Sequence, residues 1–426
     1  MTDLEGLSSP LAREDPAVAE LIEKEQQRQQ STLCLIASEN TLPQAVLEAV
    51  GSAFNSKTAE GYANHRYHTG CQVADELEAL AVERCRALFG ADHANVQPHS
   101  GVSANLAVYG AVLKPGDRVL AMKLSHGGHL SHGDAASVTH QFYSFVHYGV
   151  DPRSELLDYD QIRHLALEHR PRLLIAGASS YPRLIDFAAL RAIASEVSAY
   201  LLVDMAHVAG LVAARVIPSP VPYADFVTFT TYKTLAGPHG GVILCRSAHA
   251  RQIDRAVFPG TQGTPTLALV AGKAVCFKRA TSPAFVEAQR ATLANARALC
   301  DGLAARGYRP VTGGTDTHLL LVDLRSKGLT GNVAESALER AGILVNRNLI
   351  PFDPESTLVT SGLRLGTASI SVRGIREAEV GQIAQLIDRV LTSRQEKVEA
   401  EVRRDVEALC RAYPIATAFP AEVHET

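Results

Sequence analysis

The sequence lacks the features that mark several classes of protein. No apolar stretch reaches the roughly 18 residues that a membrane-spanning helix needs. The polar, acidic stretch from Met1 to Glu25 has no apolar core of the kind that a signal peptide requires. There is no long basic run, and the formal net charge is −4. Nucleic acids and anionic membrane surfaces are therefore poor candidates as partners.

Paired cysteines are also missing. Seven cysteines are scattered along the 426 residues, and no two of them form a Cys-x-x-Cys pair. An odd and scattered set argues against both a disulfide framework and a zinc ribbon. We expect most of these cysteines to be small buried residues in a reducing compartment, which predicts a cytoplasmic protein.

Hydrophobic residues make up 46% of the chain, which is ample for a large core. A chain of this length is too long for one compact set of layers. We expect an N-terminal arm with helices over residues 1–55, a large domain over 56–285 and a small domain over 286–426. A long helix over 282–306 is expected to lead from the large domain into the small one.

Short apolar runs alternate with helical stretches from about residue 76 onward. The runs are 118–122, 172–176, 200–204, 226–230 and 241–245. Parallel strands that are buried on both faces read as continuous apolar runs, so this pattern predicts an α/β fold with a mostly parallel sheet. Helices are expected to cover both faces of that sheet.

The flanking regions also contain recognisable elements. In the arm, helices are predicted over 16–30 and 44–54, and an ordered loop or interface segment over 55–72. In the small domain, we expect apolar segments at 317–322 and 342–346 and a helix around 377–391. We find no internal repeat.

A lysine follows one of the apolar runs. Lys233 comes three residues after Thr230, among hydroxyl-bearing residues, and the glycine-rich segment 237–241 follows it. A lysine at a strand end can lie in a closed pocket, where burial lowers its pKa and lets the amine form an imine with a carbonyl compound. Taken alone, a lysine at a strand end is more often structural or solvated, so Lys233 is weak evidence by itself.

Two further segments could serve a cofactor on that lysine. Asp204 closes the run 200–204, where a carboxylate can bind the pyridine nitrogen of pyridoxal phosphate and keep it protonated. A helix N-cap is the alternative interpretation of Asp204. The segment 97–105 passes from a loop into a helix, and its small residues let backbone amides approach a phosphate. Many helix starts would look similar.

Histidines at every third position, from His126 to His132, suggest a metal site. Two glycines interrupt this run, however, and no Cys-x-x-Cys or His-Glu-x-x-His motif accompanies it. We therefore expect no metal, and a histidine stacked on a cofactor ring suits the glycine-rich setting better.

Arg364 lies in a short, weakly polar segment, 361–367. A buried arginine needs an anion, and a substrate α-carboxylate gripped by both arms of the guanidinium would supply one. An internal salt bridge is the alternative.

These signals occur in one order and at one set of spacings. The segments concerned are 35–40, 59–62, 95–101, 126–130, 203–211, 233–238, 258–260, 313–316 and 360–362. Through them the chain resembles the serine hydroxymethyltransferase family of fold-type I pyridoxal-phosphate enzymes, from about residue 10 to residue 415. The resemblance implies a large domain with a mostly parallel seven-stranded sheet and a smaller α+β C-terminal domain.

The resemblance also implies roles around pyridoxal 5'-phosphate. Lys233 takes the place of the lysine that holds the cofactor, Asp204 that of the partner of the pyridine nitrogen, and His129 that of the histidine on the ring. The remaining cofactor contacts implied are Ser100, Gly101, Val102, Ser179, His207, Tyr232 and Gly263, the last from a neighbouring subunit. We therefore expect a homodimer or a tetramer with shared sites.

Substrate and folate positions follow from the same resemblance. Arg364 and Ser38 match the pair that binds the substrate carboxylate, and Glu60 matches the glutamate that handles protons near the folate and the substrate hydroxyl. The positions implied for tetrahydrofolate are Glu60, Tyr67, Leu124, Gly128, Leu130 and Asn348, and Tyr67 is also placed near the substrate.

The implied reaction is hydroxymethyl transfer between tetrahydrofolate and a small amino acid, with the bond between Cα and Cβ made or broken. A folate-independent aldolase or threonine transaldolase on the same scaffold is the alternative. A non-catalytic relative is a third interpretation, against which the retained Lys233, Asp204, His129 and Arg364 argue.

The chain departs from the family pattern mainly around the implied site. The residues that stand where the family usually has another are Thr58 for tyrosine, His68 for tyrosine, Val102 for serine, Tyr232 for histidine, His239 for arginine, and Thr261 and Thr264 for glycines. Thr58 removes about the volume of a ring. We therefore hypothesise that the enzyme admits 2-methylserine and alanine in place of serine and glycine.

Overall fold

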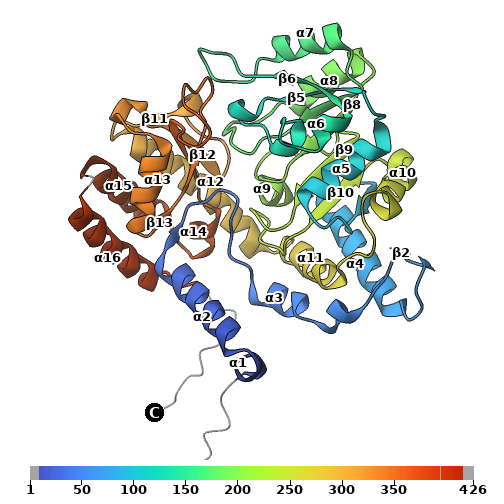
Figure 1. Ribbon diagram of the computed structural model, residues 1–426, viewed down its shortest axis with the longest axis horizontal. Helices are drawn as coiled ribbons and strands as arrows, with labels where there is room; N and C mark the ends of the chain where they lie inside the picture. The colour runs from blue at the N-terminus through green and yellow to red at the C-terminus, as the bar shows by residue number, and fades with distance from the viewer. Residues whose placement is uncertain (1–8, 394, 416–426) are drawn as a thin grey trace, which may run out of the picture.

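The computed structural model describes residues 9–393 and 395–415 and consists of two bodies joined by the long helix α12 (Pro283–Ala304). Helices α1 (Pro10–Glu14) and α2 (Pro16–Ser31) project from them as an arm (Figure 1). Residues 1–8 of the predicted arm and 416–426 of the predicted small domain lie outside the described residues.

The large body is built on a seven-stranded sheet. Its strands are β4 (His93–Asn95), β5 (Arg118–Met122), β6 (Ser144–Tyr148), β7 (Leu173–Ala176), β8 (Tyr200–Asp204), β9 (Phe226–Thr230) and β10 (Gly241–Cys245). They lie in the order β4-β10-β9-β8-β7-β5-β6, and β10 is antiparallel to both its neighbours while β9 to β6 are mutually parallel. This confirms the predicted α/β fold; β4 and β6 are the strands that the sequence analysis did not find.

The strands are apolar throughout because both faces of the sheet are covered. Within β5, Val119 and Ala121 pack into one cluster of buried residues, and Leu120 and Met122 pack into another. Alternate side chains of a strand point to opposite faces, so neither face can be polar.

Two groups of helices cover these faces. On one side lie α5 (Gly101–Val112) and α10 (Ala250–Arg255). On the other lie α4 (Gln72–Phe89), α7 (Tyr159–His169), α8 (Phe187–Glu196), α9 (Ala209–Ala213) and α11 (Leu267–Arg279). The short helix α6 (Thr139–Phe142) precedes β6.

The small body contains an antiparallel sheet and its own cluster of buried residues. The strands are β11 (Arg309–Pro310), β12 (Leu319–Asp323), β14 (Asn346–Asn348) and β15 (Gly362–Gly366), in the order β11-β12-β15-β14. The helices are α13 (Gly331–Arg340), α14 (Ala368–Val372), α15 (Glu377–Ser393) and α16 (Glu396–Ala412). The apolar segment predicted at 342–346 is divided between β13 (Ile343–Leu344) and the start of β14, which belong to different sheets.

The N-terminal segment is part of the small body's core. Strand β1 (Leu33–Cys34) pairs in parallel with β13, and Leu33 and Leu35 are buried among the small body's apolar residues. The predicted helix over 44–54 is α3 (Gln44–Val50) followed by a 3-10 turn, because Gly51 ends it. The segment 55–72 includes the hairpin of β2 (Gly61–Tyr62) and β3 (His65–Arg66). The division at 55/56 and 285/286 stays a prediction.

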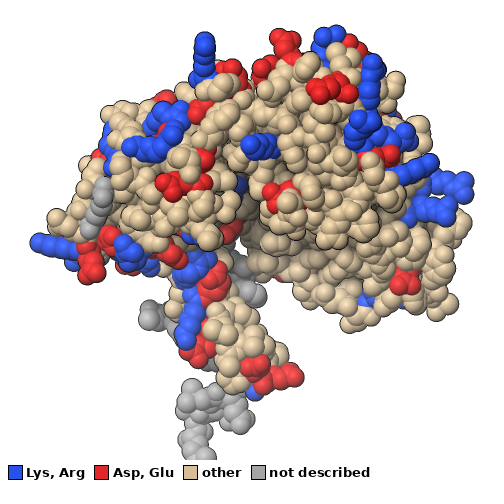
Figure 2. All heavy atoms as spheres, turned by 45° about the horizontal axis from the view of Figure 1, so that its top comes forward, with Lys and Arg blue, Asp and Glu red and all other residues tan. Residues whose placement is uncertain are grey.

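None of the helices in the described ranges is both long enough and apolar enough to cross a bilayer. Charged side chains of both signs are spread over the face shown in Figure 2, and most of the surface between them is uncharged.

The topology brings several loops to one edge of the large sheet. The carboxyl ends of β5, β7, β8 and β9 all point to this edge, because these strands are parallel. Ligands in open α/β sheets bind beyond the carboxyl ends of the strands. Among the residues singled out in the sequence, His129, Ser179, Asp204 and Lys233 lie at or beyond these strand ends.

Candidate active site

Lys233 is a buried amine without a polar partner. Lys233 lies just beyond β9 and is 7% exposed, and its Nζ forms no hydrogen bond or ion pair with the described residues. Burial lowers the pKa of its ammonium group to about 8, and the charge of Arg364 acts in the same direction, while that of Asp204 opposes it. A lysine in this condition is suited to covalent bonding with a carbonyl group.

Asp204 is a buried carboxylate held in its charged form. Its Oδ2 accepts hydrogen bonds from Asn105 Nδ2 at 2.9 Å and from His132 Nε2 at 3.2 Å, and its Oδ1 accepts one from the Ala206 N–H at 3.0 Å. Burial by itself would raise the pKa of this carboxyl, but His132 and Asn105 hold it well below its usual range. Asp204 is therefore ionised at neutral pH.

Two histidines beside the cavity are neutral. His129 Nδ1 accepts from the Ser131 N–H at 3.1 Å, and burial lowers the pKa of this imidazole to about 4. Burial also lowers the pKa of His207 well below its ordinary value. His207 stacks on the buried His318, with ring centroids 5.7 Å apart, and His318 Nε2 lies 3.1 Å from the Ala37 carbonyl oxygen. Both imidazoles present flat, uncharged faces.

The start of α5 provides an anion-binding position. Ser100 caps the helix through a reciprocal pair of bonds with Ser103. Gly101 packs so closely on β9 that a Cβ atom would lie 2.7 Å from Thr230 Cγ2, so a larger residue would be displaced toward the cavity. Unpaired N–H groups and the helix dipole favour negative charge at such an end.

Arg364 lies on β15 in the small body and does not itself line the cavity around Lys233, but it contacts Ser179, which does. Its Nη1 donates to the Ser179 carbonyl oxygen at 2.6 Å and its Nε donates to Asn346 Oδ1 at 3.0 Å. None of the described residues forms a salt bridge with it, and burial lowers its pKa to about 10. It remains charged at neutral pH and lacks an anion, which is contrary to the alternative of an internal salt bridge.

One cavity collects most of the residues predicted for the cofactor. It is lined by Ser100, Gly101, Val102, Asn105, His129, His132, Ala178, Ser179, Asp204, Ala206, His207, Thr230, Tyr232 and Lys233. Ser179 donates to the Gly128 carbonyl oxygen at 2.5 Å, which ties its loop to the loop after β5. Ser38 lines an adjoining cavity that shares Tyr232 with the first.

Three other predicted residues gather at a separate place. Glu60, Tyr67 and Gly263 do not line the Lys233 cavity; a Cβ atom on Gly263 would lie 3.2 Å from Glu60 Oε1. Tyr67 is 76% exposed and packs on Phe258, with ring centroids 5.6 Å apart. Within one chain these residues therefore form a surface of their own.

The remaining residues predicted for folate lie in two loops at the site edge. Leu124, Gly128 and Leu130 follow β5, and Leu130 is 51% exposed. Gly128 is buried, and a Cβ atom there would lie 2.3 Å from the Met122 carbonyl oxygen. Asn348 ends β14, two residues from the Asn346 that holds Arg364.

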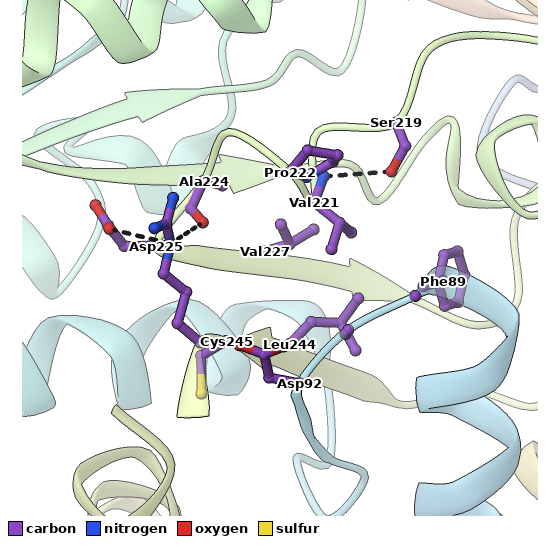
Figure 3. Close-up of a pocket in the computed structure, with 13 residues that line it drawn as sticks. Phe89, Asp92, Ser219, Val221, Pro222, Ala224, Asp225, Val227, Leu244 and Cys245 are labelled. Carbon is purple, nitrogen blue, oxygen red and sulfur yellow. Dashed lines mark hydrogen bonds and ion pairs between the residues drawn. The ribbon is translucent and has the colours of Figure 1, made fainter. Parts of the chain in front are cut away.

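A larger cavity of about 460 Å³ lies at the opposite edge of the sheet. The side chains of Phe89, Val227 and Leu244 make much of its wall, and Asp225 lies at the amino end of β9 (Figure 3). No residue predicted for the site lines it. We therefore assign the chemistry to the smaller cavity around Lys233, where the unpaired amine and the buried charges converge.

Comparison with known proteins decides the family. A family model described as serine hydroxymethyltransferase matches residues 11–387. A curated serine hydroxymethyltransferase of Coprothermobacter proteolyticus is 54% identical over 400 residues, which cover 94% of this chain and 96% of that protein. The chain belongs to the serine hydroxymethyltransferase family. It is a transferase of one-carbon metabolism that uses pyridoxal phosphate and moves a hydroxymethyl group between tetrahydrofolate and a small amino acid.

The residues around the cavity fit the cofactor that this hydroxymethyltransferase uses. The aldehyde of pyridoxal phosphate requires an amine, which Lys233 offers without a competing partner. The pyridine nitrogen requires a buried anion such as Asp204, and the phosphate requires a positive helix end such as that of α5. The comparisons favour hydroxymethyl transfer over the folate-independent aldolase reaction.

In the histidine run of this hydroxymethyltransferase, His126 and His132 form hydrogen bonds within the protein. His126 Nδ1 accepts from the Val150 N–H at 3.1 Å, and its ring packs on Phe352. His132 donates to Asp204. Within residues 9–393 and 395–415, no cluster of three or more histidine, cysteine or carboxylate side chains is arranged to hold a metal.

Several side chains that support the site of the hydroxymethyltransferase were not assigned a role from the sequence. Asn105 and His132 fix Asp204, and His318 supports His207. Lys273, fully buried on α11, donates to the carbonyl oxygens of Val96, Pro98 and Gly241 at 2.7–3.1 Å. Two of them had a sequence signal, His132 by its place in the histidine run and Asn105 by its place at the end of the segment 97–105. The others come from elements whose contacts a single sequence does not reveal.

Two departures from the family pattern belong together. Tyr232 and His239 stack with ring centroids 4.0 Å apart and planes at 16°. The family's histidine and arginine at these places could not form this pair of parallel rings. The two changes are therefore one structural change beside Lys233.

Proposed function

We propose that this hydroxymethyltransferase prefers the pair 2-methylserine and alanine to serine and glycine. The observation that carries the proposal is Thr58, whose short side chain is exposed in the single chain two residues before Glu60. The family's tyrosine would fill this place. The volume released is about that of an aromatic ring, which is more than a substrate methyl group requires.

The substrate is held and polarised by buried groups. Arg364, assisted by Ser38, binds the α-carboxylate through its free N–H groups. Pyridoxal phosphate, when bound, withdraws electrons from the Cα of the attached amino acid. Asp204 keeps its carboxylate ionised against the pyridine nitrogen, and His129 covers the ring with a neutral face. Lys233, with its lowered pKa, accepts or delivers a proton near neutral pH.

The one-carbon step takes place at the edge of the cavity. Glu60 moves the proton of the substrate hydroxyl, and the folate lies among Tyr67, Leu124, Gly128, Leu130 and Asn348. The phosphate of the cofactor is bound by Ser100, Gly101 and the first turn of α5 at Val102, with Gly263 from a second subunit. Ser179, His207 and Tyr232 complete the contacts on the cofactor.

A homodimer, or a tetramer made of dimers, supplies the missing half of this site. Glu60, Tyr67 and Gly263 gather beside one another and away from the Lys233 cavity of their own chain. Exposed apolar side chains also line the arm, among them Leu21 at 64% and Ile22 at 45%. Contact with a second copy would bury these residues and bring Glu60 to the other chain's Lys233.

We place the enzyme in the cytoplasm because its cysteines are not paired in disulfides. All seven cysteines lie in the described part of the chain, and every one is free. Burial raises the pKa of the Cys276 thiol to about 12, which leaves it protonated and unreactive. Such thiols suit a reducing compartment.

The substrate preference is tested by comparing the wild type with Thr58→Tyr. We expect the wild type to release tritium from α-labelled alanine and to cleave 2-methylserine faster than it handles glycine and serine. Thr58→Tyr should reverse the ratio. Every assay is run with and without tetrahydrofolate, and the absorbance of the bound cofactor serves as the control for loading. A wild-type preference for glycine and serine would refute the proposal.

A further inference from the structure

The turn that carries Glu60 is held by one hydroxyl group from a distant part of the chain. Thr264 Oγ1 accepts a hydrogen bond from the Ala59 N–H at 2.9 Å. Ala59 is fully buried, and within the described part of the chain its N–H has no other hydrogen-bond partner. Ala59 lies between Thr58 and Glu60, so this bond fixes the backbone that orients both side chains.

The carbonyl groups of the same turn are held from the other side. Arg66 Nη1 donates to the Ala59 carbonyl oxygen at 3.0 Å and to that of Gly61 at 2.6 Å. The Tyr67 N–H donates to the Glu60 carbonyl oxygen at 3.0 Å. Gly61 has φ of +94°, and a Cβ atom there would lie 2.3 Å from the His65 carbonyl oxygen, so only glycine fits. Thr264 therefore holds an N–H group of a turn whose carbonyl groups are bound by Arg66 and Tyr67.

The segment that carries Thr264 is itself attached to the phosphate-binding loop. Gln262 Nε2 donates to the Gln97 carbonyl oxygen at 2.8 Å, and the His99 N–H donates to Gln262 Oε1 at 3.3 Å. His99 Nε2 lies 3.1 Å from the Thr264 carbonyl oxygen. Thr264 therefore connects the loop before Ser100 to the turn before Glu60.

We propose that Thr264 is a positioning residue that sets where Thr58 and Glu60 stand relative to the substrate. The proposal rests on the functions proposed above for Thr58 and Glu60. Thr58 and Thr264 both differ from the family pattern, in which a glycine stands at the second place. A glycine has no hydroxyl to accept the Ala59 N–H. The residues at 58 and 264 therefore act together in substrate selection, because Thr264 holds the backbone next to Thr58.

The test compares Thr264→Val, which replaces the hydroxyl by a methyl group, with Thr264→Ser, which keeps the hydroxyl. Hydrogen exchange of a peptide covering residues 57–62 is measured on the holoenzyme by mass spectrometry. We expect faster exchange in the valine variant by about tenfold or more, and wild-type exchange in the serine variant. Thr264→Gly, which has the residue of the family pattern, provides a third variant compatible with the fold.

Steady-state kinetics then separate positioning from general damage. Thr264→Val should lower kcat about tenfold, because Glu60 is displaced, while the KM for the amino acid and the affinity for pyridoxal phosphate stay the same. Thr264→Ser should restore the wild-type kcat. Equal exchange and equal kcat in the valine and serine variants would overturn the proposal.

This proposal and the substrate assignment are refuted by different experimental results. If Thr58→Tyr leaves the ratio of alanine to glycine turnover unchanged, the substrate assignment is wrong, and the exchange experiment still decides the function of Thr264. In a double-mutant cycle we expect Thr58→Tyr and Thr264→Gly to be non-additive in that ratio, by about threefold or more. Additive effects would show that the two positions act separately and would overturn their coupling.

Discussion

Replacing Arg364 by lysine tests the substrate geometry most directly. The arginine is buried and uses one Nη1 bond to Ser179 and the Nε bond to Asn346, which leaves N–H groups on Nη1 and Nη2 for a carboxylate. Each charge-assisted hydrogen bond contributes about 1.5–3 kcal/mol. A lysine keeps the charge and about one such bond, so the net loss is about 2 kcal/mol, or roughly 30-fold in the dissociation constant of the amino acid.

The assay is a spectral titration of the holoenzyme with alanine and with glycine. Ethanolamine, an amine without a carboxylate, provides the matched control, because Arg364→Lys should change its binding less than threefold. Arg364→Met should lose more than 100-fold in alanine affinity and yet be at least as stable as the wild type, since it removes a buried charge that lacks an anion. An equal loss of affinity for ethanolamine and alanine would refute the carboxylate function.

The other predictions concern buried groups around the cofactor. The rate at which the apoenzyme combines with pyridoxal phosphate should rise about fivefold from pH 7 to pH 8 and level off above about pH 9, because the neutral amine of Lys233 reacts and its pKa is about 8; a rise that continues to pH 10 would contradict this. Lys273→Met removes three hydrogen bonds to backbone carbonyl groups, although the Pro98 carbonyl oxygen still accepts from the Gly241 N–H. The variant should lower the free energy of unfolding in urea by about 3 kcal/mol or more, with weaker cofactor binding, whereas Lys278→Met on the same helix should have little effect. Tyr232→Leu and His239→Leu should be non-additive by about 1 kcal/mol in a double-mutant cycle of thermal stability, and additivity would show that the stacked rings contribute nothing.

The large sheet could be predicted because its strands are buried on both faces. Four of its strands have the bounds that the apolar runs predict. Strand β6 has mixed polarity, with exposed and half-buried residues, so it has no such run. Strand β15 consists of two glycines, two leucines and Arg364, a composition that β-propensity does not favour. The antiparallel direction of β10 depends on its pairing, which the run itself does not encode.

The site could be predicted in part because its residues follow strand ends. Asp204 ends one apolar run and Lys233 follows another by three residues, and the sheet topology brings them together. The bond between Thr264 and Ala59 joins residues about 205 positions apart. No periodicity or local spacing indicates such a contact, and the same holds for His318 beside His207.

The pairing of β1 with β13 has a consequence for synthesis on the ribosome. Leu33 leaves the exit tunnel early, but its partner Ile343 is made about 310 residues later. At about 5–20 residues per second this delay lasts roughly 15–60 s. The large sheet is complete by Cys245 and can form during that time, whereas Leu33 and Leu35 stay without their core. Strand β1 is thus made before the large sheet but is among the last segments to fold, and it needs protection from aggregation until the final third of the chain arrives.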